Sequence, residues 1–333
     1  MKHRMWALLA SSCLTAALAF AVPAAVPAVA AADPTAAEVV RIDKAGPRQQ
    51  VMHVFSPSMG RTITLQVLLP FDNSEPRPTL YLLNGAGGGT GMATWYRQTD
   101  VVQFFANKNV NVVTPVDGSF SYYTDWQRDD PALGRHKWTT FLTSELPPVL
   151  DAALGASGAN AIAGVSMSAS SALNLAIAAP EVYRAVASYS GCASTSDQLG
   201  REYVELVLER GDADARNMWG EDNDPAWLAN DALVNAERLR GKTLYISSST
   251  GLPGPADTLD MVGGQAFTLA NQIILGGAIE AATNQCTVRL ADKLAALAIP
   301  ATVEFRPTGT HSWKYWEDAL HRSWPVLEEA LTR

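Results

Sequence analysis

The sequence is poor in the residues that bind nucleic acid. Its 25 lysines and arginines are outnumbered by 33 acidic residues, which gives a formal net charge of −8, and they form no basic cluster. This balance argues against a nucleic-acid partner. Histidine and cysteine are also scarce, with five and three copies, so a catalytic base or a disulfide has few candidates. No metal ion and no cofactor is expected.

Long apolar runs are missing except at the N-terminus. A run from Met5 to about Val22 follows a basic stretch at residues 2–4 and precedes small residues at 28–32. This order is typical of a secretory signal peptide, with cleavage just before Asp33. A retained membrane anchor is the alternative, but polar residues and Pro23 leave the run short for a stable span. We therefore expect an exported protein from which residues 1–32 are removed.

Loss of the signal peptide also removes Cys13 and leaves Cys192 and Cys286. An even pair in an oxidising compartment suggests one disulfide, and two buried free thiols are the alternative. Residues 33–48 are rich in alanine and proline and are expected to form a flexible lead-in. The remainder, residues 49–333, is long enough for one domain with a large core.

Strand and helix patterns alternate along this domain. The expected strands are residues 62–69, 79–83, 110–116, 160–163, 185–190, 243–247 and 300–305, and the expected helices are residues 141–154, 167–179 and 315–331. Short apolar strands separated by helices predict an α/β fold, with a mostly parallel sheet covered on both faces. Residues 195–240 match no βα unit and are interpreted as an insertion over one edge of the sheet, which could act as a lid.

Ser166 lies in Gly164-Val165-Ser166-Met167-Ser168, between a predicted strand and a predicted helix. A serine on such a sharp corner has its hydroxyl exposed above the sheet, and the helix N-terminus favours developing negative charge. Small residues are needed on both sides because the strand and helix pass closely; Ser168 replaces the usual second glycine. The motif alone is weak, but its context predicts a nucleophile in an α/β-hydrolase fold.

A serine nucleophile needs a base. His53 and His136 precede Ser166, against the usual serine–acid–histidine order of this fold. His321 falls inside the closing helix. His311 lies in a loop after the last predicted strand and is the expected base.

The third member must be a carboxylate that orients the histidine. The candidates between Ser166 and His311 are Asp257, Asp260, Glu280 and Asp292. Composition alone does not decide which of these four is the catalytic acid.

An oxyanion hole requires two backbone amides. Met167 follows the nucleophile, and the turn Asn84-Gly85-Ala86-Gly87 follows the second predicted strand. Glycines there allow the backbone to approach a substrate, so Ala86 is the expected second donor. The run at 85–89 lacks the lysine and spacing of a nucleotide-binding loop.

Four segments carry a family resemblance: residues 122–126, 137–147, 164–168 and 309–316. They resemble the secreted mycolyltransferases of the antigen 85 complex, and the likeness covers nearly the whole mature chain. The strings W-x-x-F-L-T-S-E-L-P and G-T-H-S-W-x-Y-W are long and specific. The chain is more similar to the corynebacterial or nocardial branch of that group.

The resemblance implies an activity and a set of site residues. The family moves a mycolic acyl chain from one trehalose monomycolate to another, or to cell-wall arabinan, through a serine acyl-enzyme. Its catalytic glutamate opens a helix about thirty residues before the histidine, which selects Glu280, 31 residues before His311. We also hypothesise that a Cys192–Cys286 bond ties down the segment with the acid. The implied substrate-binding residues are Asn84, Gly85, Gly87, Arg289, Ser312 and Trp313.

Three departures from the family concern the acceptor. Asn84 and Gly87 stand where the family has a trehalose-binding aspartate and an arginine, and Ser194 replaces a sugar-contacting aspartate. The expected partners are trehalose mycolates and cell-wall glycans in the cell envelope, but the acceptor itself stays open. A secreted carboxylesterase that uses water and a non-catalytic adhesin or wall-binding relative are the two alternatives.

Overall fold

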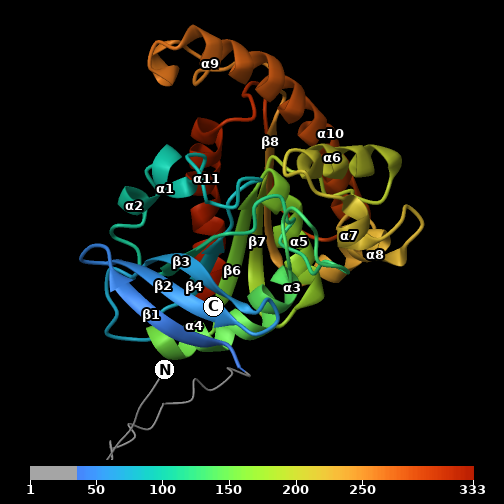
Figure 1. The fold of residues 1–333 in the computed structure, drawn as a ribbon. Helices are drawn as coiled ribbons and strands as arrows, with labels where there is room; N and C mark the ends of the chain where they lie inside the picture. Colours follow the sequence, from blue (N-terminus) through green and yellow to red (C-terminus); the bar gives the residue numbers. More distant parts are fainter. Residues whose placement is uncertain (1–35) are drawn as a thin grey trace, which may run out of the picture. The chain divides into compact units, whose positions relative to one another are not determined.

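The computed structural model describes residues 36–333. The expected signal peptide and the first residues of the lead-in lie outside this range. Within it, nine strands form one sheet in the order β1-β2-β3-β5-β4-β6-β7-β8-β9 (Figure 1). Their bounds are Glu38–Lys44 for β1, Gln49–Ser56 for β2, Arg61–Leu68 for β3, Thr79–Leu82 for β4, Asn111–Val116 for β5, Asn160–Val165 for β6, Tyr183–Tyr189 for β7, Thr243–Ser249 for β8 and Thr302–Arg306 for β9.

The sheet is antiparallel at one side and parallel elsewhere. The pairs β1–β2, β2–β3 and β3–β5 are antiparallel, and the five pairs from β5 through β4 to β9 are parallel. Because parallel strands end at the same edge, the loops after β4, β6, β8 and β9 gather there. The mostly parallel sheet predicted from the sequence is confirmed.

Helices cover both faces of the sheet (Figure 1). Their bounds are Trp95–Gln98 for α1, Val101–Phe104 for α2, Trp138–Thr140 for α3, Leu146–Leu154 for α4, Met167–Ala178 for α5, Gln198–Glu209 for α6, Ala215–Trp219 for α7, Pro225–Ala229 for α8, Ala266–Asn271 for α9, Gly277–Ala296 for α10 and Trp313–Thr332 for α11. Alternate residues of a strand enter opposite cores, as the pleat requires. Ile162 joins the core beneath α4, α5 and α10, whereas Ala161 and Ala163 join the core beneath α1, α2 and α11.

The lead-in ends earlier than predicted. Residues 38–44 pair with β2 as the antiparallel edge strand β1. Six of its seven side chains are exposed, so the segment lacks the alternating pattern that identifies a strand buried on one face.

The expected insertion forms α6, α7 and α8 between β7 and β8. Its buried residues Met218, Trp219 and Trp227 belong to the same core as α5, and Asn174 of α5 donates to the carbonyl of Asn230 at 2.6 Å. The insertion is therefore anchored on the helical layer over one face of the sheet.

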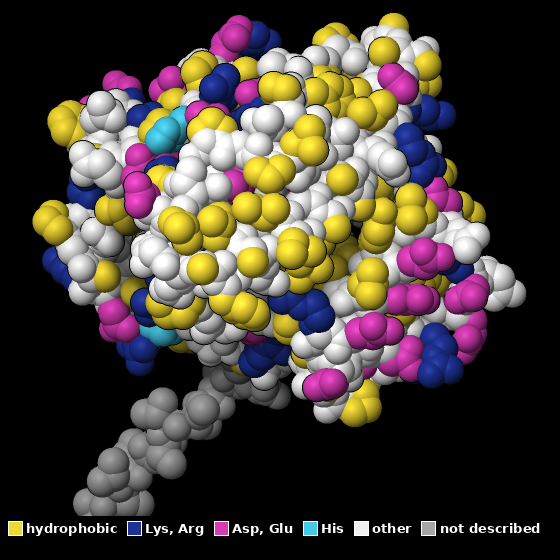
Figure 2. All heavy atoms as spheres, turned by 90° about the horizontal axis from the view of Figure 1, so that it is seen from above, with side chains coloured by type: hydrophobic (Ala, Val, Ile, Leu, Met, Phe, Trp, Pro, Cys, Tyr) yellow, Lys and Arg dark blue, Asp and Glu magenta, His cyan; other side chains and the backbone are white. Residues whose placement is uncertain are grey.

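A second helical segment outside the regular βα pattern precedes the acid candidate Glu280. Helix α9, a π-helical turn at Gln272–Gly276 and α10 follow one another without a break, and α9 projects beyond the body at the top of Figure 1. Phe267 and Ile274 on this projection are 87% and 73% exposed, and hydrophobic side chains are spread across this face in Figure 2. Within residues 36–333, no helix is long and apolar enough to cross a membrane.

Candidate active site

Ser166 lies at a sharp corner between β6 and α5, with φ 57° and ψ −123°. This backbone conformation is strained for a residue with a Cβ and is typical of functional sites. The neighbouring chain is packed so tightly that a Cβ added to Gly164 would lie 2.1 Å from the carbonyl oxygen of Ser168, and one on Gly191 would lie 2.3 Å from Cβ of Ala169. Only glycine fits at these two positions, so the sequence fixes the corner that presents Ser166.

Three side chains from distant parts of the chain meet at this corner. His311 Nε2 lies 2.8 Å from Ser166 Oγ, and His311 Nδ1 lies 2.8 Å from Glu280 Oε2. Both distances are those of good hydrogen bonds. The order serine–histidine–carboxylate is the one in which a histidine can take the serine proton while the carboxylate fixes its tautomer.

Glu280 is completely buried in the first turn of α10. Its second oxygen, Oε1, accepts hydrogen bonds from the Ser190 hydroxyl at 2.8 Å and from the Ser249 amide at 2.7 Å. The carboxylate is thus held from two sides, which leaves Oε2 aimed at His311. Sequence reasoning missed Ser190 and Ser249, which follow β7 and end β8.

The other acid candidates lie elsewhere. Asp260 and Asp292 are exposed, and Asp257 is buried in a separate hydrogen-bond cluster. This geometry agrees with the selection of Glu280 that the resemblance implied.

His311 is the histidine that contacts Ser166. Its backbone amide donates to the carbonyl of Gly276 at 3.0 Å, and its ring packs edge-on against Trp316. His53 contacts Asp43, and His321 contacts Asp100 and stacks on Phe104. His136 is buried and accepts a hydrogen bond from Trp138; burial lowers its pKa to about 4.

The turn after β4 lies against Ser166. A Cβ on Gly85 would be 3.7 Å from Cβ of Ser166, and Phe120 donates to the carbonyl of Ala86 at 2.7 Å. Among the described residues, the amides of Ala86 and Met167 donate to no protein acceptor. Two unused amides beside a serine are the donors that an oxyanion hole requires.

Asn84 does not face a substrate, which corrects the prediction from the sequence. It is completely buried, its Nδ2 donates to the Pro115 carbonyl at 3.2 Å, and its Oδ1 accepts from the Trp95 amide at 3.2 Å. Both ends of the side chain therefore hold the turn after β4 to β5 and α1. Asn84 lies in the turn after β4, as expected, but its side chain supports this turn and does not point toward Ser166.

The other predicted substrate residues are placed differently from one another. Gly87 borders open space, since an added Cβ would meet nothing within 4 Å. Ser312 occupies the N-cap position of α11 without a capping hydrogen bond to its side chain, and Trp313 packs edge-on against Trp95 and Trp316 beside His311. Arg289 is nine residues beyond Glu280 on α10, about 14 Å along the helix, and pairs with Asp197 at 2.6 Å. The structure does not bring Arg289 to Ser166. Ser194, at the position of the family's sugar-contacting aspartate, is buried.

The described residues contain no cluster of three histidine, cysteine or acidic side chains that could hold a metal ion. The site is built from protein groups that suit acyl transfer.

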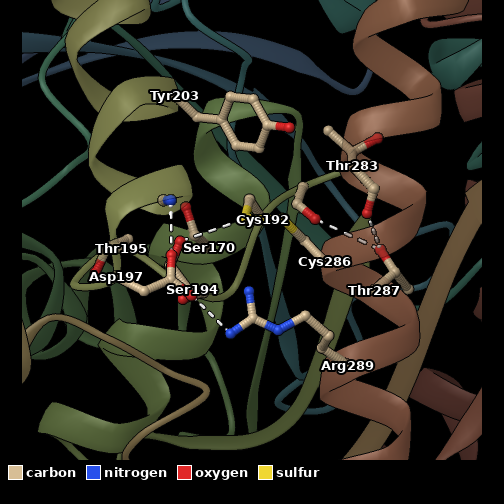
Figure 3. The surroundings of a disulfide bond; sticks show 12 residues. Ser170, Cys192, Ser194, Thr195, Asp197, Tyr203, Thr283, Cys286, Thr287 and Arg289 are labelled. Carbon is tan, nitrogen blue, oxygen red and sulfur yellow. Dashed lines mark hydrogen bonds and ion pairs between the residues drawn. A yellow bond between two sulfur atoms is a disulfide. The ribbon is translucent and has the colours of Figure 1, made fainter.

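Cys192 and Cys286 form a disulfide (Figure 3), as predicted. Cys192 lies two residues after Ser190, and Cys286 lies six residues after Glu280 on α10. The bond therefore links the two segments that the Ser190–Glu280 hydrogen bond also joins. We expect it to support the position of the acid.

Replacing both cysteines by serine should lower the free energy of unfolding by about 2–5 kcal/mol, the usual cost of losing a native disulfide. The acyl-transfer rate should also fall, because α10 loses a restraint near Glu280. Denaturant unfolding and initial rates, measured where both proteins are folded, check this. Equal stability and equal rates would show that the bond has no part in holding the acid.

The comparisons with known proteins agree with this geometry. The family model described as putative esterase matches residues 56–326. The chain is 33% identical over 290 residues to the Mycobacterium tuberculosis protein named diacylglycerol acyltransferase/mycolyltransferase Ag85A, covering 85% of this chain and 81% of that protein. It is also 33% identical to the Mycobacterium leprae protein of the same name, covering 85% and 83%.

Solved structures share the fold at lower identity. Mycobacterium tuberculosis MPT51 superposes with a TM-score of 0.71 at 24% identity, covering 86% of this chain and all of that chain. An S-formylglutathione hydrolase from Agrobacterium tumefaciens superposes with a TM-score of 0.60 at 16% identity, covering 88% and 99%. These likenesses confirm the fold.

Proposed function

Because this chain belongs to the putative esterase family and, within it, to the antigen 85 mycolyltransferases, we propose that it moves a mycolic acyl chain between trehalose esters through a Ser166 acyl-enzyme. Cell-wall arabinan is the second acceptor that the family suggests. The observation that supports this most is the chain of contacts from Ser166 through His311 to Glu280, with both distances at 2.8 Å.

In the first half-reaction, Ser166 Oγ attacks the ester carbonyl of an acyl-trehalose while His311 Nε2 takes the hydroxyl proton. Glu280 accepts the Nδ1–H bond and stabilises the positive ring. The amides of Ala86 and Met167 hold the oxyanion. When the tetrahedral intermediate collapses, the trehalose oxygen leaves with the proton from His311, and the acyl group stays on Ser166.

The second half-reaction runs the same steps with a new hydroxyl. An acceptor alcohol gives its proton to His311 and attacks the acyl carbonyl, and Ser166 recovers the proton as the product ester leaves. Water competes at this stage, so transfer requires an acceptor site that holds a sugar hydroxyl in place and limits solvent. A carboxylesterase would use the same residues with water as the acceptor.

The residues around Ser166 differ from those of the family where the acceptor would bind. Gly87 leaves open space where the family has an arginine, and Asn84 and Ser194 are buried. Trp313 borders the site and would flank a sugar ring. We propose trehalose as the first acceptor because the named relatives are mycolyltransferases.

The proposed site of action is outside the cytoplasm, in the cell envelope. The disulfide supports export, because disulfides form and persist in oxidising compartments. Removal of residues 1–32 as a signal peptide is part of the same proposal.

Purified protein incubated with trehalose monomycolate should convert two molecules of it into one trehalose dimycolate and one free trehalose. Thin-layer chromatography and mass spectrometry measure the products. Dimycolate and trehalose in equal amounts support transfer. Free mycolic acid in place of dimycolate would favour the carboxylesterase, and no turnover with a folded protein would favour the non-catalytic relative.

A further inference from the structure

Asp257 is a buried carboxylate that the proposed mechanism does not use. It is 8% exposed and accepts four hydrogen bonds. Oδ1 accepts from Gln272 Nε2 at 2.7 Å and from Thr310 Oγ1 at 2.6 Å. Oδ2 accepts from the Gly254 amide at 2.8 Å and from the Tyr315 hydroxyl at 2.7 Å. We call these five residues the Asp257 cluster.

The cluster joins three segments that surround the His311–Glu280 pair. Thr310 is the residue immediately before His311, and Tyr315 is in the first turn of α11. Gln272 opens the π-helical turn that ends at Gly276, whose carbonyl accepts the His311 amide at 3.0 Å. One carboxylate therefore bonds to both the loop that carries the base and the helical run that carries the acid.

The segment that carries Asp257 is wedged between the same two parts. Gly251 and Leu252 pair with Gly309 through two backbone hydrogen bonds of 3.0 and 2.7 Å. On its other side Gly251 lies against α10 so closely that an added Cβ would be 2.2 Å from the Gly277 carbonyl oxygen. Residues 250–257 thus act as a spacer between the histidine loop and the first turn of α10, and Asp257 fixes the end of that spacer.

The chemistry of the cluster favours an ionised carboxylate. Burial acts to raise the pKa of Asp257, but the hydrogen bonds it accepts outweigh that effect and leave the pKa below its usual value. In residues 36–333 no lysine, arginine or histidine forms an ion pair with it. All four neutral donors must point at this one buried carboxylate. The positions of the segments that carry them are therefore fixed relative to one another.

We propose that Asp257 is a positioning residue of the reaction: it holds the histidine loop and the acid-bearing helix at the spacing in which His311 reaches Ser166 and Glu280 together. This inference rests on the proposed function of those three residues. Its effect on the rate is indirect, since Asp257 has no contact with the reacting atoms. It acts through Thr310 and Gln272.

The test compares Asp257→Ala with Asp257→Asn, using p-nitrophenyl butyrate and pre-steady-state kinetics to separate substrate binding from acylation of Ser166. Alanine removes all four bonds, so the acylation rate constant should fall about 100-fold, the cost of a misplacement of about 1 Å, with binding changed less than about threefold. Asparagine can keep most of the bonds, because Gln272 can flip and the two hydroxyls can rotate. The acylation rate constant of Asp257→Asn should be about tenfold higher than that of Asp257→Ala. The exposed Asp260→Asn in the same segment is the matched control.

Thr310→Val covers the case in which Asp257→Ala does not fold. It removes the hydroxyl that bonds to Asp257 at 2.6 Å and also contacts Ser312 Oγ at 3.4 Å, at nearly constant volume beside His311. Acylation should therefore fall about tenfold while the melting temperature drops only slightly. The downfield proton resonance of the His311–Glu280 bond should weaken or shift in both variants. Unchanged acylation in folded Asp257→Ala, with a normal wild-type rate, would overturn the inference alone. If the wild-type protein itself does not acylate Ser166, the proposed function fails first.

Discussion

Replacing Ser166 by alanine should reduce acyl transfer from trehalose monomycolate by at least about 10⁴-fold, because the acyl group then has no oxygen on which to form an ester. His311 and Glu280 stay in place, since neither depends on the serine hydroxyl for its other contacts. The Ala86 and Met167 amides also remain, so the residual rate measures what binding and oxyanion stabilisation give on their own. Initial rates of dimycolate formation check the result.

The matched control is Ser170→Ala, one turn further along α5. Ser170 is buried and its hydroxyl donates to the Met167 carbonyl within the helix at 3.0 Å, so its loss should change the rate by less than about threefold, because an ordinary hydrogen bond contributes only about 1 kcal/mol and little of that acts in the transition state. If Ser166→Ala were folded and still transferred acyl groups at a comparable rate, the nucleophile would have to be another residue.

Replacing Glu280 by glutamine should lower the acylation rate by about 10²–10⁴-fold. The buried carboxylate accepts from Ser190, Ser249 and His311 at once. An amide has one accepting oxygen and one donating nitrogen, so it cannot serve both sides. If its nitrogen faces His311, the ring must carry its proton on Nε2 and cannot take the proton of Ser166. If its nitrogen faces the Ser249 amide, two N–H donors point at each other in a buried place.

Asp292→Asn is the matched control for this change. It lies on the same helix, it is exposed, and its rate and stability should stay close to those of the unchanged protein. Substrate affinity should be nearly constant in the Glu280 variant, because the lost interaction acts on the imidazolium in the transition state. A variant that kept more than about a tenth of the rate would show that another group orients His311.

Some of the site could be predicted from local pattern because its geometry is encoded locally. Ser166 follows a strand and begins a helix, and Gly164 beside it marks a position where no Cβ fits. His311 was selected because chain order removed the alternatives. Glu280 could not be chosen in this way. Asp257 is buried too, and what distinguishes Glu280 is its contact with His311 and the two donors Ser190 and Ser249, none of which is visible in the chain.

The errors have physical reasons too. Asn84 was assigned to the substrate by its match to the family's trehalose-binding aspartate, but its side chain is buried and bonded to Pro115 and Trp95. Arg289 was assigned by its match to the family and pairs with Asp197 instead. Strand β1 was missed because nearly all of its side chains face solvent. The resemblance implied a helix that opens near Glu280, but the helical run begins at Ala266; Gly276 and Gly277 suggest a break that the π-helical turn absorbs.

The cluster around Asp257 illustrates the same limit. Their sequence positions do not link them to one another: Thr310 lies within the G-T-H-S-W motif, Tyr315 lies two residues after it, and Gln272 precedes an apolar run. Only folding brings them to one carboxylate. The resemblance to known mycolyltransferases indicates the chemistry. The contacts of the Asp257 cluster suggest how Glu280 and His311 are held at a fixed distance from each other.

Covalent labelling tests the central claim most directly. The protein is treated with a serine-directed fluorophosphonate, digested, and mapped by mass spectrometry, with the Ser166→Ala variant alongside. We expect one label per chain, on the peptide that contains Ser166, and none on the variant. A label on any other peptide, or equal labelling of the variant, would contradict the assignment of Ser166 as the residue that carries the acyl group.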